Sequence, residues 1–183
     1  MAQTGAIIIH YRAHFVRRLK ETAPPIHLDF SGGREKLELG YETVKTIQDP
    51  LAAPRELLPA LLEHQESHRR AELESRQCLS GPHKDDLEIL INGAPARTFA
   101  SQGQTRTAVL CLKLGCREIF YESAGEYPVL LLDDVLSELD RKRQEFVLRR
   151  IGGGQVFITC CEEERLDALE EGKAFRIREG TIV

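Results

Sequence analysis

Two adjacent carboxylates follow the most apolar short run of the sequence. Residues 129–132 are all aliphatic, and Asp133 and Asp134 come directly after them. Such a run is typical of a buried strand in a parallel sheet, and open α/β sheets bind ligands at the carboxyl ends of their strands. Adjacent carboxylates repel unless a cation neutralises them, and Mg²⁺ prefers oxygen ligands. The pair therefore indicates a metal and water site, and a solvated strand end with a helix-capping aspartate is the alternative.

A second candidate lies at the start of a helix that we expect at residues 102–123. Ser101 and Gln104 have the spacing of a capping box, in which each side chain bonds the backbone N–H of the other residue. Gly103 would leave N–H groups open to an anion at the positive end of the helix dipole. Ser101, Gln102, Gly103 and Gln104 therefore form a candidate phosphate-binding loop, and a plain helix cap is the alternative.

A third candidate is the run Ser-Glu-Leu-Asp that follows the carboxylate pair. Either Ser137 or Asp140 can cap the helix that we expect at residues 140–150. Taken together, the order is an anion-binding helix start, an apolar strand ending in Asp-Asp, this run, and then another strand at residues 155–159.

This order of motifs resembles the second half of an ABC-type ATPase. The amino-acid sequences of the motifs resemble those of the RecF family more closely still. The resemblance covers the whole chain and is most specific around Asp133. It is carried by Ser-Gly-Gly-Arg-Glu-Lys-Leu-Glu-Leu at 31–39 with Tyr41, Gly-Pro-His-Lys-Asp-Asp-Leu at 81–87, Phe-Ala-Ser-Gln-Gly-Gln at 99–104 and Tyr-Pro-Val-Leu-Leu-Leu-Asp-Asp-Val-Leu-Ser-Glu-Leu-Asp at 127–140.

The resemblance implies a function and partners. RecF-like proteins are DNA replication and repair ATPases that bind DNA at gaps or junctions and form homodimers around Mg-ATP. With RecO and RecR they assist loading of the recombinase RecA. We therefore expect a cytoplasmic protein of DNA repair and recombination. A DNA- or partner-binding module without a nucleotide role is the alternative, and a phospho-acceptor domain fits less well because only about fifty residues follow Asp134.

The resemblance also implies a role for each motif. Ser101 and Gly103 of the signature loop would contact the γ-phosphate of ATP held by the other subunit. Asp133 would serve Mg²⁺ and Asp134 the attacking water, as Walker B residues. Ser137 and Asp140 would form the D-loop, with Asp140 at the dimer contact. Thr159 would stand where related ATPases have a switch histidine, and the turn formed by His83, Lys84, Asp85 and Asp86 would be structural or functional.

Several departures from the ABC pattern bear on activity. The chain contains no G-x-x-x-x-G-K-[ST] phosphate loop, which supplies most phosphate contacts in such sites. We therefore expect the chain alone to bind Mg-ATP very weakly and to be inactive. Asp134 stands where many ABC ATPases have glutamate, which suggests slow hydrolysis. Lys84 stands where the family more usually has arginine.

The elements that must position these residues predict an α/β fold. We expect the C-terminal half of an ABC-type ATPase lobe at residues 81–183, with a mostly parallel sheet and flanking helices. Residues 1–80 would form a helical arm with a β-hairpin near 26–41. In the arm, a first helix with Ile8, Tyr11, Phe15 and Leu19 on its apolar stripe would end at Pro24-Pro25.

The remaining elements follow from periodicity and turn residues. A long helix is expected at 55–78, charged in its second half. A strand at 87–91 and the turn Asn92-Gly93 would lead to a return strand at 97–100. The helix at 102–123 would bury Val109, Leu112, Cys116 and Ile119. A short helix near 163–170 and strands at 173–178 and 181–183 would complete the chain.

Composition limits the partners. A formal net charge of −4 gives no support for non-specific nucleic-acid binding, so DNA contact requires a local basic patch. The candidate patches, each with acids nearby, are Arg17-Arg18-Lys20, Arg69-Arg70, Arg141-Lys142-Arg143 and Arg149-Arg150. The five cysteines lack a zinc-type spacing and indicate reduced, buried thiols in the cytosol. The histidine pairs His10–His14 and His64–His68 are expected on solvated helix faces.

Overall fold

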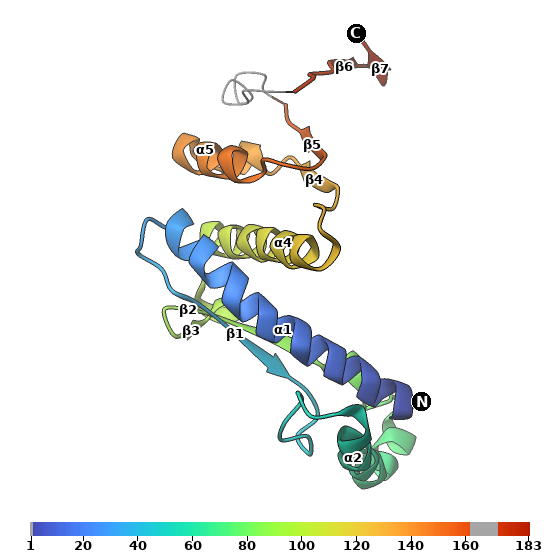
Figure 1. Ribbon diagram of the computed structural model, residues 1–183. Coiled ribbons are helices and arrows are strands. Elements are labelled where there is room, and N and C mark those ends of the chain that lie inside the picture. Colours follow the sequence, from blue (N-terminus) through green and yellow to red (C-terminus); the bar gives the residue numbers. More distant parts are fainter. Residues whose placement is uncertain (1, 162–171) are drawn as a thin grey trace. The chain divides into compact units, whose positions relative to one another are not determined.

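The computed structural model describes residues 2–161 and 172–183 (Figure 1). The chain divides into two compact units. Unit 1 ends at Ile119 and unit 2 begins at Phe120. The expected boundary at 80/81 lies inside unit 1, where strands from both sides of it pair. The mixture of helices and parallel and antiparallel strands confirms the α/β class.

Unit 1 combines helices with a three-stranded antiparallel sheet in the order β1-β2-β3. Its elements are α1 (Ala2–Phe30), β1 (Leu37–Glu42), α2 (Pro54–Ser75), the 3₁₀ turn η1 (Pro82–Lys84), β2 (Asp86–Ile91), β3 (Ala94–Pro95), α3 (Ala96–Phe99) and α4 (Gln102–Ala124), whose last turn extends past the division.

The first helix is longer than expected, because α1 continues through Pro24 and Pro25 to Phe30. Prolines remove helical hydrogen bonds, but packing can offset that cost, and Ile26 and Phe30 beyond the prolines are buried. The expected strand at 26–30 is therefore helical, and the hairpin near 26–41 is wrong. β1 pairs instead with β2, so that Leu37 lies opposite Ile91.

The buried stripe of α1 also differs from the expected one. Ile9 and Val16 are buried with Leu19, whereas Ile8 and Phe15 lie at the surface and Tyr11 is 70% exposed. The small residues of the buried stripe, Gly5, Ala6, Ala13 and Ala23, leave room for neighbouring elements. A Cβ added at Gly5 would come within 3.0 Å of the Leu61 side chain of α2.

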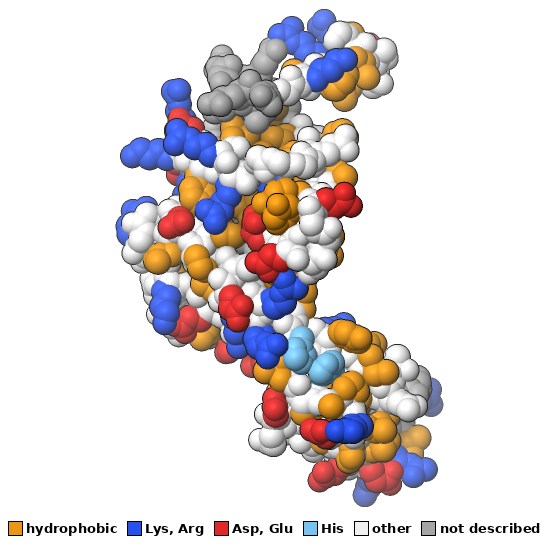
Figure 2. Space-filling model, viewed as in Figure 1, with side chains coloured by type: hydrophobic (Ala, Val, Ile, Leu, Met, Phe, Trp, Pro, Cys, Tyr) orange, Lys and Arg blue, Asp and Glu red, His pale blue; other side chains and the backbone are white. Residues whose placement is uncertain are grey.

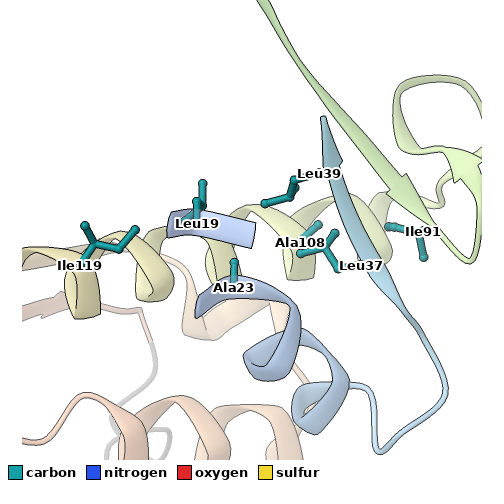
Figure 3. Packing of buried hydrophobic residues seen from close by; sticks show 7 residues of the cluster. All are labelled: Leu19, Ala23, Leu37, Leu39, Ile91, Ala108 and Ile119. Atoms are coloured by element: carbon teal, nitrogen blue, oxygen red, sulfur yellow. The ribbon is translucent and has the colours of Figure 1, made fainter. Parts of the chain in front are cut away.

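Two buried clusters hold unit 1 together. The first joins α1, the sheet and α4, and Figure 3 shows its side chains meeting between these elements: Leu19, Ala23, Leu37, Leu39, Ile91, Ala108 and Ile119. The second joins the start of α1 to α2 through Ala6, Ile9, Val44, Ile47, Leu57 and Leu61. The apolar side chains of both clusters come from segments far apart in the sequence.

Two expectations for the middle of the chain need correction. After the Asn92-Gly93 turn, whose φ angles are 52° and 77°, the return strand has only two residues and 96–99 form the short helix α3. In α4 the buried face is set by Ala108, Cys111 and Leu114, whereas Val109 is 48% exposed; Leu112 and Cys116 are only partly buried. The helix itself was predicted correctly, and of its predicted inner face Ile119 is buried and Leu112 and Cys116 pack against the core, so only Val109 was wrong.

Unit 2 contains a parallel pair of strands with a helix between them in sequence. Its elements are β4 (Leu130–Asp133), the 3₁₀ turn η2 (Leu136–Glu138), α5 (Arg141–Arg150), β5 (Val156–Thr159), β6 (Ile177–Arg178) and β7 (Thr181–Ile182). β4 and β5 are parallel, and β6 and β7 form an antiparallel pair. The helix expected near 163–170 lies outside the described residues.

The apolar strand β4 is buried on one face only. Leu132 is buried, but Leu131 is 70% exposed, which contradicts the expectation of burial on both faces.

The free cysteines differ in burial, since Cys111 is buried while Cys78 and Cys161 are exposed. Among the described helices, none is long and apolar enough to cross a bilayer.

Candidate functional site

The carboxylate pair lies at the end of the parallel strands of unit 2. Asp133 ends β4 directly opposite Thr159, which ends β5. The Thr159 hydroxyl donates to Oδ1 of Asp133 at 2.5 Å and accepts the backbone N–H of Asp134 at 3.0 Å. Both aspartates are exposed. One hydroxyl therefore orients the first carboxylate and the backbone of the second, while solvent and ligands retain access to both.

The turn after the pair is held by its own side chains. Asp134 has a positive φ of 51°, a conformation that aspartate tolerates better than most residues. Ser137 donates to the Asp134 carbonyl at 2.7 Å. Asp140 accepts the backbone N–H of Arg143 at 3.1 Å and so caps α5. Of the two expected caps, Asp140 is the one used.

The capping box at the start of α4 is present in unit 1. The Ser101 backbone N–H donates to Oε1 of Gln104 at 2.9 Å, and the Gln104 N–H donates to the Ser101 hydroxyl at 3.2 Å. A Cβ added at Gly103 would meet no atom within 4 Å. Ser101, Gln102 and Gly103 are exposed, so the helix start is open to an approaching group.

One residue of this loop's surroundings was missed by sequence reasoning. Glu35 accepts a hydrogen bond from Nε2 of Gln104 at 2.9 Å. The other Glu35 carboxylate oxygen lies 3.8 Å from Nε2 of His27, which is fully buried in α1. The Ser31 hydroxyl accepts the Glu35 backbone N–H at 3.1 Å. Glu35 and Gln104 are 69 positions apart in the sequence, so no local pattern could reveal the contact.

The turn at residues 83–86 divides into buried and exposed parts. The Asp85 side chain is 3% exposed and accepts bonds from Arg12 at 3.0 Å, Tyr41 at 2.5 Å and Thr43 at 2.8 Å. Burial, and then the hydrogen bond to Asp85, raise the pKa of Tyr41 well above its usual range. Asp85 thus joins α1, β1 and the turn, and its role is structural.

The other three residues of that turn face outward. His83 Nε2 lies 2.9 Å from the Cys78 carbonyl, and Asp86 pairs with Arg97 at 3.1 Å. Lys84 is exposed. The turn is therefore anchored through Asp85 and presents Lys84 to solvent.

The histidine pairs make more contacts with the rest of the protein than residues on solvated helix faces would make. His10 and His14 contact the carbonyls of Ala52 and Leu51 at 2.8 and 3.2 Å. His64 is buried, and its Nδ1 lies 2.8 Å from the Ser80 hydroxyl. Each pair therefore ties a helix to a neighbouring segment.

Many of the predicted basic patches are paired with acids. Arg69 and Arg70 pair with Glu66 and Glu74 on exposed faces of α2. Arg141 and Arg149 both reach Glu145 in α5, where Figure 2 shows basic side chains gathered at the surface. Arg17 contacts His14, and Arg18 contacts the Ile119 carbonyl. These pairings fit the solvated faces that were the alternative to DNA contacts.

The comparisons with known proteins agree on a family. No protein-family model matches the chain. DNA replication and repair protein RecF of Clostridium kluyveri is 38% identical over 184 residues, covering 100% of this chain and 49% of that protein. RecF of Bacillus subtilis is 39% identical and RecF of Symbiobacterium thermophilum 43% identical; this chain is covered fully in both cases and 50% of each relative is matched.

Solved structures give the same result. The recombination mediator protein RecF-ATPrS in the RecFOR pathway has a TM-score of 0.84 and 36% identity, covering 99% of this chain and 47% of that one. The corresponding RecF-ATP structure has a TM-score of 0.83, with 100% and 49% covered. The chain is thus an α/β protein of the kind seen in these nucleotide complexes. It belongs to the RecF family and spans about half the length of the curated relatives it matches.

Proposed function

We propose that the chain supplies the signature loop, Walker B strand and D-loop of a RecF-type ATPase that acts in DNA replication, repair and recombination. The observation that carries this proposal is the exposed pair Asp133 and Asp134, oriented by Thr159 at the carboxyl ends of two parallel strands. Relatives that match the chain over its full length are named RecF, and one solved relative is described as RecF-ATP.

The carboxylate oxygens of the pair fit a hard cation, because they are exposed and one of them is already fixed by a hydroxyl. Mg²⁺ bound with ATP would neutralise charge on the phosphates. Asp133 would hold the cation directly or through water, and Asp134 would polarise the attacking water. Thr159 fixes the orientation of the Asp133 carboxylate and of the Asp134 backbone, and it stands in for a switch histidine.

The open start of α4 provides the second part of the site. Ser101 and Gly103 face the γ-phosphate of ATP held by the partner subunit, while Gln102 and Gln104 complete the loop. Ser137 and Asp140 form the D-loop at the dimer contact. The whole protein binds gapped or junction DNA and works with RecO and RecR in the cytoplasm.

The first test uses the chain alone. Because it has no phosphate loop, calorimetry with Mg-ATP should detect no micromolar binding, and no phosphate release should exceed the buffer rate. Micromolar affinity of the isolated chain for ATP would contradict the assignment of this chain to one wall of a shared site.

The second test restores a complete protein by joining this chain to the unmatched half of the Bacillus subtilis relative. Ser101→Arg should abolish ATP-driven dimerisation, measured by light scattering, while ATP binding stays within about threefold because the loop acts in trans. Asp134→Asn should keep the dimer and lower hydrolysis by about 10²-fold or more. Ser75→Arg, at the exposed end of α2, is the control.

The outcomes of the second test separate two functions. Unchanged dimerisation in Ser101→Arg, combined with normal DNA binding, would favour the module without a nucleotide role. Loss of dimerisation in the Ser75→Arg control as well would show that an added arginine is harmful at any exposed position.

A further inference from the structure

A groove of about 290 Å³ in unit 1 carries positive charge that the proposed nucleotide site does not use. Three parts of unit 1 line it: residues 43–46, the middle of α2, and the two residues Leu79 and Lys84. Its polar lining includes Lys45, Lys84, His64 and His68, and none of the described carboxylates lines it. The Glu72 carboxylate beside the groove accepts the backbone N–H groups of Leu79 and Ser80. The groove therefore offers cations and imidazoles to an anion.

The two lysines are available for a ligand. Both are exposed, and within the described part of the chain neither forms an ion pair. This sets them apart from the arginines of α2 and α5 that contact acids on their own helices. Lys45 and Lys84 are 39 positions apart in the sequence, so neither belongs to a basic run.

Hydrogen bonds hold the walls of the groove together. Thr43, two residues before Lys45, donates to Asp85, which is adjacent to Lys84, at 2.8 Å. Thr46 donates to the Ala60 carbonyl of α2 at 2.7 Å. His64 of α2 contacts the Ser80 hydroxyl at 2.8 Å. These three links join each wall to another, so the backbones that carry the lysines are fixed before a ligand arrives.

Two histidines line the groove together with the lysines. The His64 and His68 rings are stacked with centroids 4.0 Å apart, and Nδ1 of His68 donates to the His64 carbonyl at 2.9 Å. His64 is buried and bonded, whereas His68 is only partly buried. An anion in the groove would therefore lie close to the His68 ring, so the NMR signals of that ring can report binding.

We propose that this groove binds a phosphate group of the DNA backbone. Lysines are point-charge phosphate binders, and a chain with net charge −4 needs a local site of this kind. The groove has no aromatic ring on which a base could stack apart from the two histidines, one of which is buried. Contact with the backbone of a duplex therefore fits better than recognition of bases. The choice of DNA rests on the proposed function in repair.

The experiment measures binding of a short labelled duplex to this chain by fluorescence anisotropy over a range of salt concentrations. Lys45→Gln and Lys84→Gln should each weaken binding by about 3- to 10-fold at low salt and reduce the salt slope by about one. Lys113→Gln, at an exposed position of α4 outside the candidate basic patches, removes the same charge and should change binding less than twofold.

A second readout places the ligand. The imidazole signals of His68 in NMR spectra should shift when duplex DNA is added to the wild-type chain, and should not shift in the Lys45→Gln/Lys84→Gln double variant. Backbone spectra of the double variant should match the wild type, because both lysines are exposed.

Two results would overturn the inference. Equal weakening in the Lys113→Gln control would show a general charge effect. A shift of the His68 signals by inorganic phosphate but not by duplex would show that free phosphate is the ligand. In either case ATP-driven dimerisation of the completed protein would be unaffected, so failure here is distinguishable from failure of the proposed function.

Discussion

At the scale of single residues, Glu35 connects the loop at the start of α4 to the buried end of α1. Its carboxylate accepts a bond from Gln104 and lies near His27, while Gln104 also holds the Ser101 backbone. The orientation of the candidate signature loop thus depends on a side chain that precedes it by more than sixty residues.

Replacing Glu35 tests that dependence. Glu35→Ala should destabilise unit 1 by about 1 kcal/mol and increase hydrogen exchange of the first amides of α4, because Gln104 loses a charge-assisted bond. Glu35→Gln keeps an acceptor and should restore most of the exchange protection. The measurement is hydrogen exchange by NMR on the chain, with Glu66→Ala on α2 as the control. Equal exchange in the wild type and Glu35→Ala would argue against a positioning role.

Residue-scale chemistry was predictable where it is local. The capping box at Ser101 and Gln104, and the cap at Asp140, follow from spacings of three residues and were found in the structure. Contacts of Glu35 and Asp85 join segments far apart in the chain, and no spacing encodes them. The identity of the carboxylate pair was visible in the sequence, but the hydroxyl of Thr159 that orients it required the strand register.

At the scale of elements, tertiary packing explains the errors. Pro24 and Pro25 predict the end of a helix, yet α1 continues because Ile26 and Phe30 find buried positions. Three consecutive isoleucines at 7–9 made the apolar stripe of α1 ambiguous by one position, and the structure buries Ile9. Long, strongly periodic helices such as α2 and α4 were placed within a few residues.

The contact between α2 and the segment before η1 should respond to pH through His64. Burial, and then the charge of His68, lower the pKa of His64 below its usual 6.5. Below that pH the unfolded chain binds a proton that the folded chain excludes, so stability should fall as pH decreases through about 6.5.

Denaturant unfolding at several pH values measures this effect. His64→Gln can keep a bond to Ser80 but cannot titrate, so the loss of stability on acidification should be smaller in the variant than in the wild type. His68→Gln, which removes the partly exposed ring, should change the slope less. An identical pH dependence in the wild type and His64→Gln would exclude His64 as the source.

At the scale of the whole molecule, the sheet of unit 2 carries an apolar face with no cover in the described chain. Leu131 and Phe157 lie opposite each other on adjacent strands and are 70% and 53% exposed. Isolated exposed apolar residues are common, but a pair on one sheet face is typical of a surface that packs against another element. Since the RecF relatives are about twice as long, we expect the unmatched half to cover this face.

That expectation predicts that one substitution is nearly neutral in this chain alone and destabilising in the completed protein. Leu131→Thr should change the stability of this chain alone by less than about 0.5 kcal/mol, because the side chain is already in water. In the protein completed with the unmatched half of the Bacillus subtilis relative, the same change should cost about 2 kcal/mol, because it removes buried apolar surface. Leu73→Thr on α2, where the side chain is 74% exposed, is the matched control and should be neutral in both. Denaturant unfolding of the four variants measures the difference, and a neutral Leu131→Thr in the completed protein would mean that the face stays uncovered there.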